Sequence, residues 1–393
     1  MAVKTGLSSG MARPRRPFYT DEHEALRDTV RRFVAKEIRP NAEAWDEAGI
    51  FPRELYGKAG EVGLLGLGFP EAYGGVEADT FSSLLVAEEV ALGGSGGVAA
   101  GMMSHGIGAP PIAAFGSEEL KQRVLPGILA GEKICALAIS EPSGGSDVAN
   151  LQTVAERDGD HYVIRGQKTF ITSGMRADWI TTAVRTGAPG MGGISLLVVP
   201  GDAPGLERTS LPKMGWWASD TATLYFDECR VPVANRLGEE NHGFLAIMHN
   251  FNSERMHIAG LALGFSRVCL EEALGWAKER KTFGKPLVRH QVIRHKLVDM
   301  AQRIAALEST LDILAWRLER GDAPVAEVCM AKNQATQCFE FCAKEAVQIL
   351  GGAGYIRGTV CERLYRETKV LSIGGGAEEI MKELAARQLG WLR

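Results

Sequence analysis

The chain has 393 residues, of which 45% are hydrophobic and 23% are charged, and its formal net charge is −4. This length suggests two or three domains, and the hydrophobic content lies well above the range of disordered chains. The small negative charge gives no reason to expect nucleic acid or an anionic membrane as a partner. The seven cysteines form no C-x-x-C pair, so we expect reduced thiols and neither a disulfide framework nor a metal site.

The first part of the chain has a helical pattern. Residues 1–18 are expected to form a disordered tail and 19–133 a helical domain, which begins at Thr20 as the N-cap of the first helix. Further helices are predicted at 53–62, 80–92 and 117–129, the last with Ser117 as its N-cap. The segment 94–99 matches the loose dinucleotide-binding fingerprint, but a predicted helix precedes it where that fingerprint needs a strand, so we reject it. The uncharged run 90–117 is rich in glycine and makes a poor membrane span.

Strand-forming residues dominate from 134 to 242, which we expect to be a separate β domain. The candidate strands are 135–139, 153–156, 161–172, 179–185, 194–199 and 223–226. The pair Asp158-Gly159 between two of them predicts a tight hairpin. Six short strands in about 100 residues indicate a barrel or a sandwich.

Residues 243–393 return to a helical pattern and are expected to form the third domain. The predicted helices are 243–280, 288–319, 324–350 and 376–389. Four helices of this kind indicate a four-helix bundle. The whole chain is therefore expected to be α+β and mostly helical.

One loop and the hairpin after it have the features of a ligand site. Ser140 and Ser146 offer hydroxyl groups, and Gly145 leaves the backbone N–H groups between them open to a ligand. The hairpin then leads to Phe170, an apolar ring, beside Thr172, a hydroxyl, which would suit a planar ligand with a polar edge. The residues alone equally allow an ordinary β-hairpin with a Ser/Gly turn.

Several segments, in one order along nearly the whole chain, resemble the acyl-CoA dehydrogenase family. They are I-S-E-P-S-G-G-S-D (139–147), G-Q-K-T-F-I-T-S-G (166–174), P-K-M-G-W-W-A-S-D-T (212–221), E-R-K-T-F-G-K-P (279–286), V-Q-I-L-G-G-A-G-Y (347–355) and I-G-G-G-A-E-E-I-M-K (373–382). The resemblance implies an N-terminal helical domain, a central β-barrel-like domain and a C-terminal four-helix bundle. It also implies FAD as cofactor, acyl-CoA as substrate, electron-transfer flavoprotein as electron acceptor, and a homotetramer built as a dimer of dimers.

The reaction that the resemblance implies is α,β-dehydrogenation of an acyl-CoA thioester in fatty acid β-oxidation. In much of the family the base that removes the α-proton is a glutamate of the C-terminal Y-E-G-T segment, and here that position is Gly375. Its backbone N–H remains, and we expect it to hold the thioester carbonyl. Isovaleryl-CoA and long-chain members carry their glutamate in a helical E-R pair, which Glu254 and Arg255 match. Glu254 also falls on an apolar helix stripe formed by Ile247, Phe251, Ile258 and Leu261. A carboxylate in such a stripe needs a partner or a function, and a structural ion pair with Arg255 or Lys369 is the alternative.

The resemblance also implies the residues that contact FAD and substrate. On one side, the expected flavin contacts are Leu137, Ile139, Ser140, Gly145, Ser146, Phe170, Ile171, Thr172, Ala377 and Glu379. Across a subunit boundary, the expected contacts are Arg280, Thr282, Phe283, Gln291, Gln348, Gly351 and Gly352. The expected substrate contacts are Ser146, Asn252, Arg255 and Gly376. Ala377 replaces a family threonine, so one hydrogen bond to the FAD phosphate is expected to be missing.

Three further functions remain open from the sequence. An acyl-CoA oxidase or a flavin monooxygenase would share the fold, and a non-catalytic DNA-binding or scaffold protein would be a third alternative. The glycines at 374–376 remove bulk beside the thioester, which favours a long-chain or branched acyl group. The expected location is the cytoplasm for a bacterial protein or the mitochondrial matrix for a eukaryotic one, without membrane insertion.

Overall fold

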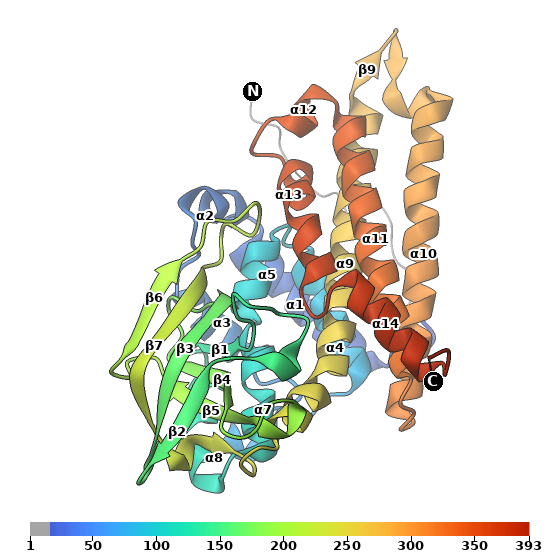
Figure 1. Cartoon of the computed structure of the whole chain (residues 1–393). Coiled ribbons are helices and arrows are strands. Elements are labelled where there is room, and N and C mark those ends of the chain that lie inside the picture. Colours follow the sequence, from blue (N-terminus) through green and yellow to red (C-terminus); the bar gives the residue numbers. More distant parts are fainter. Residues whose placement is uncertain (1–15, 393) are drawn as a thin grey trace.

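The structure is a computed structural model that describes residues 16–392, apart from the side chains of residues 249, 250 and 252. Helices of the N-terminal and C-terminal parts of the chain lie together, and the sheet formed by the middle part lies at their side (Figure 1). None of the helices in the described range has the length and apolar content that a membrane crossing requires.

From residue 16 onward the N-terminal part contains eight α-helices, and the caps predicted for two of them are confirmed. Thr20 Oγ1 accepts a hydrogen bond from His23 N at 3.4 Å, and Ser117 Oγ accepts one from Leu120 N at 3.2 Å. The segment 94–99, rejected as a dinucleotide fingerprint, follows a helix and opens another. The helices are α1 (Asp21–Phe33), continued by a π-helical turn (Val34–Ile38), α2 (Ala42–Ala48), α3 (Glu54–Glu61), α4 (Thr80–Ala91), α5 (Gly96–Met102), α6 (His105–Gly108), α7 (Pro110–Phe115) and α8 (Glu118–Leu129).

Of the expected disordered tail, residues 1–15 lie outside the described residues. For residues 16–18 the expectation is wrong, because Arg16 is buried and forms ion pairs with Glu88 at 2.9 Å and Asp312 at 3.0 Å. These two acids belong to α4 and to α10 (Gln291–Glu319). The chain is therefore fastened across two helices before Tyr19.

The middle part folds into one eight-stranded sheet with the order β6-β7-β3-β2-β4-β5-β8, to which β1 adds as a parallel neighbour of β4. The hairpin predicted at Asp158-Gly159 joins β2 to β3, with Asp158 opposite His161. Two strands, β6 and β8, were not predicted. The strands are β1 (Cys135–Ala138), β2 (Val154–Asp158), β3 (His161–Thr172), β4 (Trp179–Arg185), β5 (Ile194–Pro200), β6 (Leu206–Ser210), β7 (Thr221–Pro232) and β8 (Arg236–Leu237).

The C-terminal part is a bundle of long helices, with a small hairpin at one end and α14 toward the other (Figure 1). The expected helix at 376–389 is present as α14, but a helix that the sequence did not predict, α13, lies against α9 and α11 as the fourth member of the bundle. The elements are α9 (Gly243–Glu279), the hairpin β9 (Lys281–Thr282) and β10 (Lys285–Pro286), α10, α11 (Val325–Leu350), α12 (Gly352–Tyr355), α13 (Val360–Ile373) and α14 (Glu378–Gln388).

The long helix α9 packs closely on α4, and this contact joins the two helical parts. A Cβ atom at Gly264 would stand 2.4 Å from the carbonyl oxygen of Glu88, so only a glycine permits the approach. One continuous core runs from these helices to the inner face of the sheet and includes Phe51, Leu224 and Phe339. All seven cysteines are buried free thiols, as expected, and Cys338 and Cys342 on α11 belong to this core.

Candidate active site

Glu254 lies on α9, on the apolar stripe that the sequence predicted. Of the stripe residues, Ile247, Ile258 and Leu261 are all buried. Removal of the carboxyl from water raises the pKa of Glu254 to about 7, although Arg255 and Lys332 pull it down. A carboxyl with this pKa exchanges its proton near neutral pH, which is what a general base requires.

A turn of three glycines, 374–376, stands directly beside that carboxyl. It follows α13, whose last hydrogen bond runs from Gly374 N to Val370 O at 2.8 Å. A Cβ atom placed on Gly375 would lie 3.6 Å from Glu254 Oε1, so the carboxylate and the backbone of Gly375 are neighbours. The same Cβ would stand 2.4 Å from Ile258 Cδ1, and φ at Gly375 is +66°. Space and backbone conformation both demand glycine at this place.

His257, one turn further along α9, carries an imidazole that could also accept a proton. Burial, together with the neighbouring His105, lowers its pKa to about 4. At neutral pH its imidazole is therefore a weaker base than the Glu254 carboxylate.

The loop between β1 and β2 is fastened by a buried ion pair that the sequence analysis missed. Lys168 Nζ on β3 donates to Glu141 Oε1 at 2.7 Å and to Ile139 O at 3.0 Å. The Glu141 carboxylate also accepts hydrogen bonds from Gln152 N at 2.6 Å and Thr153 N at 2.9 Å. The Glu141–Lys168 pair thus holds the start and the end of the loop together. Gly145 and Ser146 are exposed at the tip of the loop.

Phe170 is turned out of the sheet by an irregularity in β3. The pairing of β3 with β7 shifts register between Lys168 and Ile171, and Phe170 takes a left-handed φ of +63°. Its ring is 71% exposed, whereas Ile171 beside it is buried. A flat ring system can stack on such a ring. With the glycine loop and the neighbouring Thr172, the residues present therefore fit a flavin.

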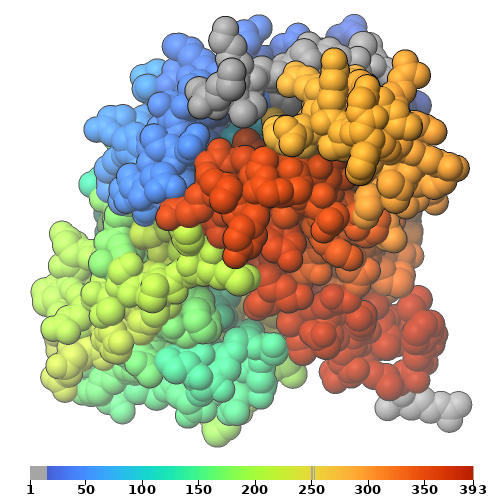
Figure 2. Space-filling model, turned by 90° about the horizontal axis from the view of Figure 1, so that it is seen from above, coloured from blue at the N-terminus to red at the C-terminus, as the bar shows by residue number. Residues whose placement is uncertain are grey.

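Leu137, Ile139 and Ser140 line the start of this loop, at or just after β1, and are partly buried. At the far side, Ala377 is the N-cap of α14 and provides no side-chain cap. Glu379 is exposed in the first turn of the same helix. Figure 2 shows a recess where the green atoms of the sheet part meet the red atoms of the C-terminal segments.

The second group of expected cofactor residues gathers at the hairpin end of the bundle, away from Glu254. Phe283 is 95% exposed at the hairpin turn, with a left-handed φ of +49°, and its ring lies 6.2 Å from that of His290. The other expected contacts at this end are the exposed residues Arg280, Gln291, Gln348, Gly351 and Gly352 and the partly buried Thr282. The structure places this group at the C-terminal ends of α9 and α11 and the beginning of α10 (Figure 1).

The expected substrate contacts are only partly brought together. Arg255 is buried, with its guanidinium carbon 5.5 Å from the centre of the Phe251 ring, and Gly376 belongs to the glycine turn. Ser146 lies at the exposed tip of the loop. The side chain of Asn252 lies outside the described residues.

Lys332 is a residue of this region that the sequence analysis did not identify. It is fully buried on α11, and its Nζ donates to Gly376 O at 2.9 Å. Lys369, which was considered as a partner of Glu254, pairs with Glu340 at 3.1 Å instead. The spacing from Cys329 and Ala335, both buried on α11, placed Lys332 on the buried face and was the signal that could have revealed it.

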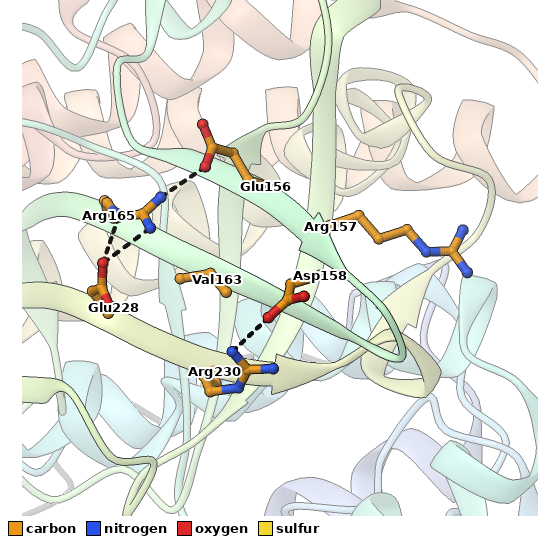
Figure 3. A pocket seen from close by; sticks show the side chains of 7 residues that line it. All are labelled: Glu156, Arg157, Asp158, Val163, Arg165, Glu228 and Arg230. Atoms are coloured by element: carbon orange, nitrogen blue, oxygen red, sulfur yellow. Dashed lines mark hydrogen bonds and ion pairs between the residues drawn. The ribbon is translucent and has the colours of Figure 1, made fainter.

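A hollow of about 320 Å³ on the outer face of β2, β3 and β7 is separate from these residues (Figure 3). Its charged side chains are engaged with one another: Arg165 pairs with Glu156 at 2.8 Å and Glu228 at 3.0 Å, and Arg230 pairs with Asp158 at 2.8 Å. Cross-strand ion pairs of this kind are typical of a solvated sheet face. The hollow contains none of the expected site residues.

Comparison with known proteins agrees with these features. The sequence matches the N-terminal domain of acyl-CoA dehydrogenase over residues 20–132, the middle domain over 136–229 and the C-terminal domain over 241–390. It is 36% identical over 378 residues to the mitochondrial long-chain specific acyl-CoA dehydrogenase of Sus scrofa, covering 95% of this chain and 88% of that protein.

Two solved structures are similar over nearly their whole length. A probable acyl-CoA dehydrogenase from Mycobacterium abscessus has a TM-score of 0.93 and 48% identity, covering 95% of this chain and 100% of the other. A glutaryl-CoA dehydrogenase from Mycobacterium smegmatis, solved in complex with FADH2, has a TM-score of 0.89 and 28% identity, covering 95% of this chain and 96% of the other.

Proposed function

Because the chain belongs to the acyl-CoA dehydrogenase family and its cofactor is FAD, we propose that Glu254 is the base that removes the α-proton of the acyl-CoA thioester. The product is the trans-2-enoyl-CoA. FAD, when bound, accepts the β-hydrogen as a hydride. The steps that the protein itself performs are the binding of the thioester, the polarisation of its carbonyl and the acceptance of the α-proton.

The position of the Glu254 carboxylate beside Gly375 is the observation that carries this proposal. The two residues are 121 positions apart (375 − 254), yet a Cβ at Gly375 would lie 3.6 Å from Glu254 Oε1. A carboxylate from α9 thus stands beside the position where much of the family has its glutamate side chain. Burial, which raises the pKa of Glu254 to about 7, makes this carboxylate a stronger base than one in water.

The backbone N–H of Gly375 is proposed to donate to the thioester carbonyl oxygen. The α-proton of a thioester becomes acidic only when its carbonyl is polarised, and a fixed N–H does this without reorganisation. The left-handed backbone at Gly375 supports this role, because glycine places no side chain of its own beside that N–H.

FAD would be held by two groups of residues that one chain cannot bring together. Glu254 and Arg280 are 26 residues apart (280 − 254), and Glu254 lies within α9, which ends immediately before Arg280. At about 1.5 Å per residue this separation is about 39 Å, which exceeds the length of one FAD molecule. We therefore propose that the loop at 137–146, Phe170 and Thr172 hold the flavin end in one subunit. The group around Arg280, Phe283 and Gln348 would hold the adenosine end of FAD from the neighbouring subunit, in a tetramer built as a dimer of dimers.

A long or branched acyl chain is the proposed substrate. Three glycines at 374–376 leave the carbonyl end of the site without side chains, so bulk near the β-carbon meets no obstacle from this turn. The similarity to a long-chain specific enzyme supports the same class. A panel of straight and methyl-branched acyl-CoAs tests this; activity on C4 substrates alone would contradict it.

Electron-transfer flavoprotein is the proposed electron acceptor, in β-oxidation in the cytoplasm of a bacterium or the matrix of a mitochondrion. Stopped-flow reoxidation of the reduced enzyme compares this acceptor with air. Faster reoxidation by the flavoprotein supports a dehydrogenase, whereas rapid reoxidation by air identifies an oxidase.

The decisive experiment for the base is anaerobic mixing of acyl-CoA with the Glu254→Gln holoenzyme. We expect FAD to remain bound and its visible absorbance to persist, whereas the wild-type enzyme is bleached. Bleaching of the variant at near wild-type rate would show that another group accepts the proton.

A further inference from the structure

Lys332 is a cation in the interior, which requires a reason. Its side chain on α11 is fully buried, and an ammonium group removed from water is destabilising unless it is paired or has a function. Burial lowers the pKa of Lys332 to about 8, although the negative charge of Glu254 acts to raise it. The lysine is thus largely charged at neutral pH.

The Lys332 ammonium group is hydrogen-bonded to the glycine turn. Its Nζ donates to Gly376 O at 2.9 Å, and the next residue of α11, Asn333, donates through Nδ2 to Glu378 O at 2.9 Å. Two successive side chains of one rigid helix therefore hold the backbone on both sides of Ala377.

The glycine turn has no side chains of its own that could fix its backbone. Gly375 and Gly376 have φ values of +66° and +104°, and glycine gives up more conformational freedom on folding than any other residue. Without side chains, the direction of the Gly375 N–H depends on what fixes the neighbouring backbone. Lys332 fixes the carbonyl of the very next residue.

Among the described side chains, the charged and titratable groups that act on Glu254 and Lys332 come from three helices. Glu254 and Arg255 lie on α9, Cys329 and Lys332 on α11, and Glu378 at the start of α14. Arg255 and Lys332 both favour the ionised Glu254 carboxyl, and Arg255 repels Lys332. Lys332 is therefore linked both to the proposed base and to the turn with the proposed carbonyl donor.

We propose that Lys332 is a positioning residue of the reaction, which holds the Gly375 N–H toward the thioester carbonyl through Gly376 O and helps to keep Glu254 ionised at neutral pH. This inference rests on the proposed role of Glu254. Lys332 itself donates no proton and contacts no reacting atom in this scheme.

Two substitutions separate the charge from the hydrogen bond. Lys332→Met removes both in a side chain of similar length, and Lys332→Gln removes the charge but keeps an N–H donor. For both holoenzymes we expect the pH midpoint of kcat/KM to rise by roughly one unit, since an opposite charge has been removed. In Lys332→Met we also expect kcat to fall about 100-fold, as for a misplaced catalytic group, with a smaller loss in Lys332→Gln.

The controls use other changes of the same kind. Lys369→Met removes an exposed lysine that pairs with Glu340, and it should leave the midpoint where it is. Lys332→Arg keeps the charge and should restore the wild-type midpoint. Infrared titration of the Glu254 carboxyl band, identified by its loss in Glu254→Gln, gives the same midpoint without turnover. Retained FAD and an unchanged circular dichroism spectrum establish that a variant is folded.

The outcomes are distinct for the two proposals. A wild-type midpoint in the folded Lys332→Gln enzyme, by kinetics and by infrared titration, would overturn the role of Lys332, whatever the stability of Lys332→Met. A Glu254→Gln enzyme that still bleaches with acyl-CoA would instead overturn the proposed base, and the infrared titration would then decide the effect of Lys332 on Glu254 alone.

Discussion

At neutral pH, Glu254→Gln should inactivate the enzyme and, at the same time, increase its free energy of unfolding. The pKa of Glu254 is raised from 4.5 to about 7 by burial, a difference of about 2.5. Each pKa unit corresponds to about 1.4 kcal/mol, so an ionised carboxylate in this place costs about 3 kcal/mol of folding free energy. Glutamine has the shape and neutrality of the protonated acid and avoids that cost.

The pH dependence of the effect follows from the direction of the pKa change. Below the unfolded pKa of 4.5 the carboxyl is protonated in both states, so wild type and variant should be equally stable. Between 4.5 and about 7 the unfolded chain releases its proton more readily than the folded one, and wild-type stability falls relative to the variant. We expect the advantage of Glu254→Gln to be about 1 kcal/mol at pH 5 and about 3 kcal/mol above pH 7.

Urea unfolding of both holoenzymes across this pH range measures the difference. Glu61→Gln is the matched control, because Glu61 is an exposed carboxylate on α3, and it should change stability by no more than about 0.5 kcal/mol. An advantage of Glu254→Gln that does not grow with pH, or a loss of stability at pH 9, would show that the carboxylate is solvated or firmly paired. The reasoning from burial to basicity would then be wrong.

Three further results are expected. The kcat/KM of the wild-type enzyme should fall as pH drops below about 7, tenfold per unit, as Glu254 becomes protonated; a pH-independent rate would exclude it as the base. Gly375→Ala should lower the free energy of unfolding by about 1–2 kcal/mol, measured by urea, because its Cβ meets Ile258 Cδ1 and φ is +66°; an unchanged value would mean that the turn relaxes freely. Lys168→Met should weaken FAD binding, measured by fluorescence titration, because it frees the loop and leaves Glu141 buried without its ammonium partner. The double variant with Glu141→Gln should recover part of the affinity. An unchanged dissociation constant for FAD in Lys168→Met would refute the role of the ion pair.

The sequence predicted those elements that short stretches of neighbouring residues determine: helix caps, a tight turn and an apolar helix face. The hydroxyl caps Thr20 and Ser117, the hairpin at Gly159 and the stripe that carries Glu254 all appear where the pattern indicated. In each case the neighbours in the sequence determine the local structure. The helical period alone was enough to predict that Glu254 lies on the buried face of its helix.

The helix α13 escaped prediction because several of its buried positions are charged, which obscures the apolar period. Glu367 is buried and accepts hydrogen bonds from Gly96 N at 2.8 Å and Gly97 N at 3.3 Å, and Arg363 Nε donates to Gly94 O at 2.8 Å. The partners lie about 270 residues earlier in the chain, so no window of sequence around α13 contains them. The strand β6 was missed for another reason, since none of its side chains is fully buried and Leu206 is its only large apolar residue.

The residues around Glu254 also include features that the local sequence determines and features that depend on distant contacts. Periodicity places Glu254 and Lys332 each on the buried side of its own helix. That they share a space with the glycine turn depends on how α9, α11 and the segment after α13 pack, which no local pattern expresses. The motif resemblance indicated Glu254 and Gly375, but Lys332 belongs to none of the recognised segments.

The length of α9 also has a genetic consequence. If each flavin is held between the Glu254 end of one chain and the Arg280 end of another, two inactive variants with substitutions at different ends can complement one another. In a dimer of a Glu254→Gln chain with an Arg280→Ala chain, one site collects both defects and the other collects none. Co-expression of the two inactive alleles should therefore restore part of the activity, up to one working site in two for every mixed pair.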